Sequence, residues 1–288
     1  MSVESPLSRL IDKEDLLGKY WNRKHAVFKG AVPVEGFLDE NAIQQLFDMG
    51  LLRWPYFTLL KEGVQPERSA MTRARNVGGQ DVQDFADAQA VRDHLAKGAT
   101  LKLSQLEDWH LPTRNMMREI ETRLPAELKA YMFYTPCDNS GMLPHRDGSH
   151  VLAVQISGEK EWRLYAAPGQ IDARSGLDVD ADRPTDAFIM EPGDVLYLPH
   201  GYPHAATARG GTSLHLTFTI TEPTPLDLVE SLLSTFADSS GYLLERHYRM
   251  RLEDKADAVI KALLYHLECV DSQALVDTAL RQMRQRTV

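Results

Sequence analysis

The chain has 288 residues, of which 43% are hydrophobic and 25% are charged, so it is long enough for one large folded domain with a small appendage and is not disordered by composition. Its net charge of −9 argues against nucleic acid as the main partner, and no apolar run is long enough to span a membrane. The two cysteines, Cys137 and Cys269, form no pattern and the N-terminus does not resemble a signal peptide, so we expect a cytoplasmic protein without a disulfide framework.

The N-terminal part of the chain alternates between helical and extended patterns. Asp39 is the predicted N-cap of a helix over residues 39–49, and Pro125 ends a helix over residues 115–124. Residues 63–83 are charged and irregular, which indicates a hairpin or an exposed loop near the functional site. The predicted helices cover residues 7–20, 39–49, 88–96 and 115–124, and the predicted strands cover residues 26–30 and 54–60.

The centre of the chain is a series of short strands without intervening helices. These strands cover residues 131–134, 151–156, 161–165, 187–190, 195–198 and 213–220. Regularly spaced short strands predict an all-β sandwich or barrel, and the jelly roll is the architecture associated with cupins. We therefore predict a domain over residues 1–222, with N-terminal helices and a mainly β core over residues 130–222.

After Pro223 and Pro225 the pattern becomes helical again. Apolar side chains recur at helical spacing in three stretches, around residues 226–236, 259–266 and 275–283. We place a domain boundary at the prolines and predict a small helical domain over residues 223–288.

His145 and Asp147, with His204 far downstream, are the strongest functional signal. On an extended strand, residues two apart point to the same face, and two histidines with one carboxylate are the ligands of the facial triad that binds Fe(II) and leaves positions open. The segment from Glu191 to His204 reads as a turn, a buried strand and a second turn that presents His204. The sequence therefore predicts an iron site at these three residues.

Lys160 lies next to a predicted turn at residues 157–159, on the same strand face as Trp162 and Leu164. A buried lysine needs an anion, because an unpaired buried charge is costly, and the carboxylate of a bound 2-oxo acid would supply one. A lysine at a hairpin end can also extend to solvent. The sequence leaves both readings open.

Other polar and aromatic side chains can line a pocket. His215 and Thr217 share the polar face of the strand over residues 213–220, which is either solvated or turned to the barrel interior. Tyr131 and Phe133 precede the metal-binding segment and form either the opposite wall or ordinary core. His150 is expected in a surface turn.

Three segments, residues 143–147, 155–165 and 198–204, together resemble the Jumonji-C oxygenases of the ribosomal-oxygenase branch. The opening, residues 20–30, is similar to the start of those proteins, although His25 stands where proline often follows the lysine. The resemblance implies a double-stranded β-helix with Fe(II) on His145, Asp147 and His204. It also implies a salt bridge from Lys160 to 2-oxoglutarate in a pocket that Tyr131, Phe133, His215 and Thr217 line.

The expected activity is that of a 2-oxoglutarate-dependent dioxygenase, which uses O2 to hydroxylate a side chain in a peptide or protein. No catalytic residue is expected beyond the metal centre. The resemblance further implies a homodimer through residues 223–288, a tail that is short for the winged-helix module of ribosomal oxygenases. Two alternatives remain open: the same chemistry on a free amino acid or natural-product intermediate, and a cupin that binds metal without catalysis.

Overall fold

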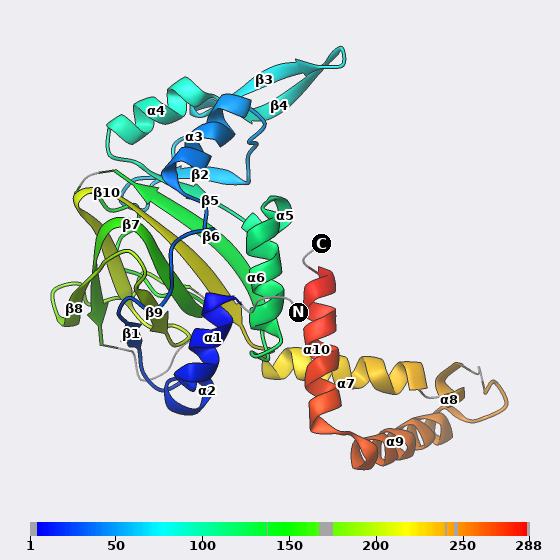
Figure 1. Cartoon of the computed structure of the whole chain (residues 1–288). Coiled ribbons are helices and arrows are strands. Elements are labelled where there is room, and N and C mark those ends of the chain that lie inside the picture. The colour runs from blue at the N-terminus through cyan, green and yellow to red at the C-terminus, as the bar shows by residue number, and fades with distance from the viewer. Residues whose placement is uncertain (1–4, 137, 167–174, 240, 245–246, 287–288) are drawn as a thin grey trace. The chain divides into compact units, whose positions relative to one another are not determined.

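The computed structural model of the chain describes residues 5–136, 138–166, 175–239, 241–244 and 247–286. The chain divides into two compact units, each with its own internal contacts. Unit 1 comprises Met1–Leu124 and Leu128–Thr221, and unit 2 comprises Pro125–Glu127 and Glu222–Val288. Figure 1 shows both units with their helices and strands.

The N-terminal half of unit 1 supplies short helices and strands around one large sheet. The helices are α1 (Pro6–Lys13), α2 (Leu16–Lys19), α3 (Glu40–Met49), α4 (Ala88–Ala96), α5 (Leu106–Trp109) and α6 (Leu111–Glu121). The strands are β1 (Ala26–Phe28), β2 (Phe57–Leu60), β3 (Thr72–Val77), β4 (Gln80–Ala86) and β5 (Thr100–Leu103). A 3-10 turn, η1, covers Arg68–Ala70.

Side-chain caps fix where α3 and α4 begin. The Asp39 carboxylate accepts a hydrogen bond from the Ala42 amide of α3, as the sequence predicts, and Asp87 accepts from the Gln89 and Ala90 amides of α4. Each carboxylate satisfies amides that have no partner inside the helix.

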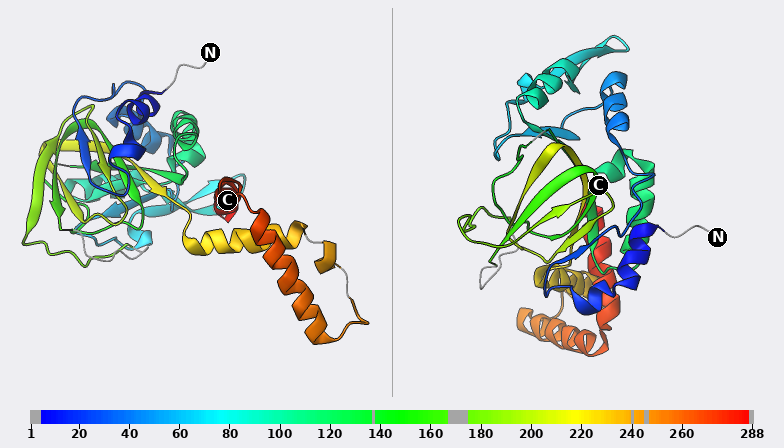
Figure 2. Two further views of the ribbon diagram at one scale, coloured as in Figure 1. Left: turned by 90° about the horizontal axis from the view of Figure 1, so that it is seen from below. Right: turned by 60° about the vertical axis from the view of Figure 1, so that its left-hand side comes forward.

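The second half of unit 1 contains the longest strands. They are β6 (Glu127–Thr135), β7 (His150–Tyr165), β8 (Pro184–Met190), β9 (Val195–Leu198) and β10 (His204–Thr221). The large sheet has the strand order β1-β9-β7-β10-β6-β5-β2, and β8 pairs with β7 outside this path. The pairings with a described register are all antiparallel. The strands curve around a common interior (Figure 2), as the expected jelly roll requires.

Strand β7 is one continuous strand where the sequence suggests two strands and a turn. Its first half pairs with β9 and its second half with β8, while β10 runs along both halves. Gly158 has a φ of +63° at the junction, and the Gln155 side-chain amide donates to the carbonyls of Ser157 and Gly158. The turn prediction at residues 157–159 was wrong because this local irregularity redirects the strand without reversing it.

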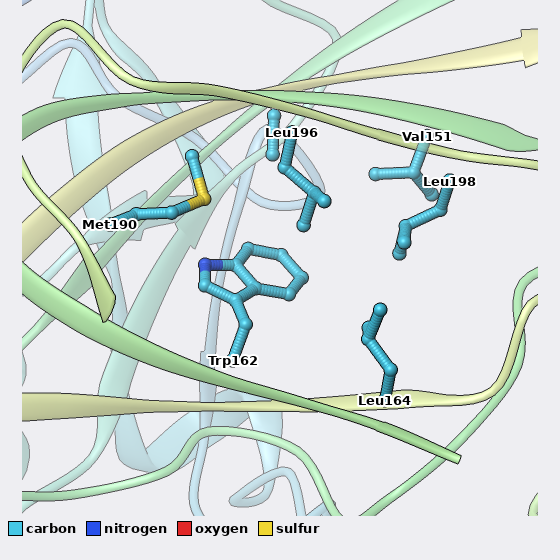
Figure 3. Packing of buried hydrophobic residues seen from close by; sticks show 7 residues of the cluster. Val151, Trp162, Leu164, Met190, Leu196 and Leu198 are labelled. Atoms are coloured by element: carbon cyan, nitrogen blue, oxygen red, sulfur yellow. The ribbon is translucent and has the colours of Figure 1, made fainter. Parts of the chain in front are cut away.

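A tight apolar cluster is built from side chains of β7, β8 and β9. Figure 3 shows Trp162 on β7 at its centre, with Met190 of β8 and Leu196 of β9 beside the indole ring. Its members share almost complete burial: Val151, Ala153, Trp162, Leu164, Met190, Leu196 and Leu198. Each large side chain of this kind stabilises the fold by roughly 1.5–3 kcal/mol through burial.

Several local predictions were incomplete. The helix predicted from residue 115 begins at Leu111 with Pro112 in its first turn, and β5 was missed entirely. Of the two forms expected for residues 63–83, the structure has the hairpin β3–β4, and none of its residues lines the pocket described below. His150 is buried, not in a surface turn: its ring stacks on Trp21, and its Nδ1 lies 3.0 Å from the Tyr197 hydroxyl.

Unit 2 is helical. It contains α7 (Pro225–Ser239), α8 (Gly241–Leu244), α9 (Leu252–Cys269) and α10 (Ser272–Arg286). Helices α7 and α10 pack together, and the Ser231 hydroxyl of α7 donates to Gln282 of α10 at 2.8 Å. Helix α9 has no buried residue. Among the described helices, none combines the length and apolar character that crossing a bilayer would require.

Candidate metal centre and its pocket

The structure brings His145, Asp147 and His204 together. Nε2 of His145 lies 3.8 Å from one Asp147 carboxylate oxygen, and Nε2 of His204 lies 3.7 Å from the other. One ligand atom from each residue falls within 4.8 Å of the other two. Both histidines are buried, and Asp147 is partly exposed. Such a cluster has the ligand types and spacing that a divalent first-row metal requires.

The backbone explains how residues far apart in sequence converge. His145 and His204 form an isolated antiparallel bridge, in which the His145 amide donates to the His204 carbonyl at 3.0 Å and the His204 amide donates back at 2.8 Å. The Gly201 amide donates to the Asp147 carbonyl at 3.1 Å. Three hydrogen bonds therefore hold the segment around His145 against the turn before β10.

The hydrogen bonds of the two imidazoles leave the correct nitrogens free for a metal. Nδ1 of His145 donates to the Leu143 carbonyl at 2.8 Å, and Nδ1 of His204 donates to the Tyr202 carbonyl at 2.9 Å. A carbonyl oxygen only accepts, so each Nδ1 carries the proton and each Nε2 presents a lone pair. Metal-binding histidines in proteins are oriented in this way, so the donor set fits a metal ion.

Burial also keeps His204 in the form that binds metal. The pKa of His204 is lowered to about 4, chiefly by burial and further by the neighbouring His145, against an opposing effect of Asp147. The imidazole is therefore neutral at neutral pH. The Trp162 ring, from the apolar cluster of Figure 3, lies 5.6 Å from the His204 ring and keeps this side of the site dry.

Arg146, between two of the three residues, fastens the neighbouring loop. Its backbone exchanges two hydrogen bonds of 2.9 Å with Gly176, and its Nε donates to the Asp178 carboxylate at 2.8 Å. This guanidinium lowers the pKa of the Asp178 carboxyl. The loop residues 175–178 are thereby tied to the segment that carries His145 and Asp147.

Lys160 is buried inside the same pocket. Its Nζ donates to the Thr135 hydroxyl at 3.2 Å and lies 3.0 Å from Nδ1 of His215. Burial lowers the pKa of Lys160 to about 7, and burial together with Lys160 and His204 lowers that of His215 well below its usual value. Because Lys160 is buried, the alternative of a lysine that reaches solvent was wrong. No carboxylate of the described residues pairs with its ammonium group.

The pocket has a volume of about 200 Å³ and contains the predicted residues. His145, Asp147, His204 and Lys160 line it, as do the four residues expected to form its walls: Tyr131, Phe133, His215 and Thr217. Phe133 stacks on His215 with ring centroids 4.9 Å apart. The polar face of β10 is therefore turned to the barrel interior.

One charged residue of the pocket, Lys102 on β5, was not predicted from the sequence. The alternation from Thr100 to Leu103, with leucines on either side of the lysine, is a short strand signal that could have indicated it. Met142 and Trp162 also line the pocket.

A double-stranded β-helix whose interior presents two histidines and a carboxylate defines a metal-binding protein of the cupin class. Residues 103–228 match the model of the JmjC domain, which is a similarity over part of this fold.

Curated relatives align with a larger part of the chain. Ribosomal oxygenase 2 of Mus musculus is 27% identical over 217 residues, which cover 72% of this chain and 44% of the mouse protein. The bifunctional lysine-specific demethylase and histidyl-hydroxylase NO66 of Drosophila mojavensis is 24% identical over 228 residues, 73% of this chain and 24% of that protein. The chain thus spans less than half the length of these relatives.

Solved structures share the fold. The X-ray structure of E. coli ycfD superposes with a TM-score of 0.55 at 18% identity and covers 92% of this chain and 69% of that one. A structure of the same E. coli ribosomal oxygenase in complex with cobalt and 2-oxoglutarate gives a TM-score of 0.54 at 17% identity, covering 92% and 68%.

Proposed function

We propose that this protein is an Fe(II)- and 2-oxoglutarate-dependent oxygenase that hydroxylates a side chain in a peptide or protein. The observation that carries the proposal is the convergence of His145, Asp147 and His204 beside Lys160, a buried lysine for which the described residues offer no carboxylate. When bound, iron and 2-oxoglutarate supply the oxygen activation and the oxidative decarboxylation to succinate that drive hydroxylation of a C–H bond.

The protein's own residues would bind the metal, orient 2-oxoglutarate and exclude water from the pocket. His145, Asp147 and His204 would hold the metal, with both Nε2 atoms free because the Nδ1 protons are engaged. Lys160 would bind the distal carboxylate of 2-oxoglutarate, and that pairing would restore its positive charge. Tyr131, Phe133, His215 and Thr217 would enclose the co-substrate and exclude water.

A protein substrate is supported by the relatives, whose names describe a ribosomal oxygenase and a histidyl-hydroxylase. We further propose a homodimer through residues 223–288, supported by the exposed apolar side chains of unit 2. A reducing cytoplasm suits the exposed, unpaired Cys269.

The test is turnover of 2-oxoglutarate by the iron-loaded protein, with peptides or a cell lysate as substrate source. We expect oxygen-dependent succinate formation and a gain of one oxygen atom on a peptide, mapped by mass spectrometry. His204→Ala should abolish metal retention and turnover, while His94→Ala on α4 is the matched control. Full turnover by His204→Ala would contradict the ligand assignment. Metal retention without succinate formation would favour a non-catalytic cupin, and oxidation of only free amino acids would favour the small-molecule alternative.

A further inference from the structure

Lys102 is a second lysine inside the pocket. It lies on β5, and its Nζ is placed over the Tyr131 ring, 4.4 Å from the centroid, and 5.8 Å from the Phe133 centroid. Burial lowers the pKa of Lys102, and the Asp147 carboxylate opposes this effect. The Lys102 ammonium group therefore interacts electrostatically with the Asp147 carboxylate of the candidate metal centre.

The Lys102 ammonium has no carboxylate or hydrogen-bond partner among the residues that the structure describes. Aromatic faces stabilise a cation, but a contact with a ring is weaker than a hydrogen-bonded ion pair. Lysines at the surface avoid this cost by extending into water. Lys102 instead keeps its amine among pocket-lining side chains, which is an arrangement suited to an incoming anion.

Lys102 and Lys160 stand at opposite ends of one row of side chains. The strands β7, β10, β6 and β5 are consecutive in the sheet, and each contributes one member. Lys160 contacts His215, His215 stacks on Phe133, and Phe133 lies beside Lys102. The two ammonium groups are thus separated by an aromatic pair, so they provide two distinct positive positions.

The charges of the pocket leave Lys102 without a counterion when the proposed ligands are bound. A divalent metal and Lys160 together balance Asp147 and the two carboxylates of 2-oxoglutarate. Lys102 is the remaining charged residue of this pocket. An ammonium in a partly desolvated site attracts an anion because the local dielectric is low.

We propose that Lys102 is a second carboxylate-binding residue of this pocket. This inference rests on the proposed function of the same site and concerns what else enters it. The carboxylate has two possible sources, an acidic group of the substrate or an end of 2-oxoglutarate itself, and the charge balance favours the substrate.

The experiment compares the wild type with Lys102→Met, Lys102→Arg and Lys97→Met, all loaded with redox-inert, diamagnetic Zn(II). Methionine keeps an apolar stem against Tyr131 and Phe133, and arginine keeps the charge. Lys97→Met removes an exposed lysine from the same unit. Calorimetry measures the Kd of 2-oxoglutarate. NMR titration at saturating 2-oxoglutarate then measures binding of N-acetyl-aspartate N-methylamide, with the asparagine analogue as the neutral control.

We expect Lys102→Met to weaken one of these two affinities at least tenfold, while Lys102→Arg and Lys97→Met remain within about threefold of the wild type. Weakened aspartate-analogue binding assigns Lys102 to the substrate, and weakened 2-oxoglutarate binding assigns it to the co-substrate. Unchanged values for both probes overturn the inference. Thermal unfolding verifies that each variant is folded, and Lys102→Gln replaces the methionine variant if it is not.

Failure of the proposed function has a different signature. It would appear in the wild type itself, as absence of metal-dependent 2-oxoglutarate binding and turnover. Unchanged binding in Lys102→Met with normal wild-type turnover would remove only the assignment of Lys102.

Discussion

Lys160 has opposite effects on the stability of the ligand-free protein and on the proposed function. Its ammonium is buried and contacts only neutral groups in the described structure, the Thr135 hydroxyl and the His215 imidazole. Desolvation of an unpaired ammonium opposes folding, and its lowered pKa of about 7 expresses that cost. The side chain therefore destabilises the ligand-free protein and becomes favourable only when a carboxylate arrives.

Replacement of Lys160 by methionine should stabilise the ligand-free protein while impairing it as an enzyme. We expect the free energy of unfolding to rise by roughly 1–4 kcal/mol, because an apolar side chain fills the same buried space. The affinity for 2-oxoglutarate should fall more than about tenfold with the loss of a charge-assisted hydrogen bond. Denaturant unfolding and calorimetry measure the two effects, with Lys97→Met as the control for loss of a lysine.

The stability difference should depend on pH. In the folded state Lys160 has a pKa of about 7, against an ordinary lysine pKa of 10.5. Between these values the unfolded chain binds more protons, so the wild type gains stability as the pH rises through this window. The advantage of Lys160→Met should be largest at pH 7 and below and should shrink toward pH 10. An advantage that is constant across this range would contradict a buried, titrating lysine.

At the scale of single elements, the redirection of β7 at Gly158 places Lys160 in the pocket. A Cβ on Gly158 would lie 1.9 Å from the Thr212 carbonyl oxygen of β10, and Gly158 has a φ of +63°. The neighbouring Gly210 has almost the same backbone angle, +65°, but no atom lies within 4 Å of its Cβ position. A side chain at Gly210 would therefore meet only the strain of a left-handed backbone. A side chain at Gly158 would meet the same strain and also collide with β10.

Gly158→Ala should therefore be far more damaging than Gly210→Ala. We expect about 1 kcal/mol of destabilisation at Gly210, from the left-handed conformation alone. At Gly158 we expect more than about 3 kcal/mol, because backbone atoms of β10 must move as well. Urea unfolding of both variants measures the difference. Equal losses would mean that contact with β10 does not limit this position.

Helices and strands with local signals could be predicted from the sequence, whereas contacts between distant segments could not. The helix with the Asp39 N-cap and the Val195–Leu198 strand follow from local signals, namely a cap and a run between turns. The burial of His150 does not, because its partners Trp21 and Tyr197 come from distant segments. Strand β5 was missed because four residues carry little periodicity, and Lys102 was missed with it.

The residues that the structure brings together at the candidate site have local sequence signals. His145 and Asp147 are two residues apart, and on an extended strand such side chains point to the same face. The turn signal at residues 199–203 indicates that His204 follows a turn. The chemistry of the donor set then predicts a metal without knowledge of the fold. The aromatic row between Lys160 and Lys102 could not be predicted, because it depends on the order of four strands in the sheet.

At the scale of the whole molecule, helix α9 of unit 2 presents an exposed apolar face. On α9, Ile260, Leu264 and Leu267 are 55%, 56% and 45% exposed, and their spacing places them on one side of the helix. Exposed apolar groups clustered in this way mark interaction surfaces. The proposed homodimer would bury this face.

The double substitution Ile260→Asp and Leu264→Asp should therefore convert a dimer into a monomer. Two carboxylates in an apolar interface would each carry a desolvation cost of several kcal/mol, enough to raise the dimer Kd by more than a thousandfold. Sedimentation equilibrium measures the change, and Lys261→Glu on the same helix is the control for an added negative charge at an exposed position. A wild type that sediments as a monomer, or a double variant that remains dimeric, would show that this face serves another role. Because the pocket lining lies wholly within unit 1, 2-oxoglutarate affinity should be unchanged in the monomeric variant, which separates assembly from the chemistry of the site.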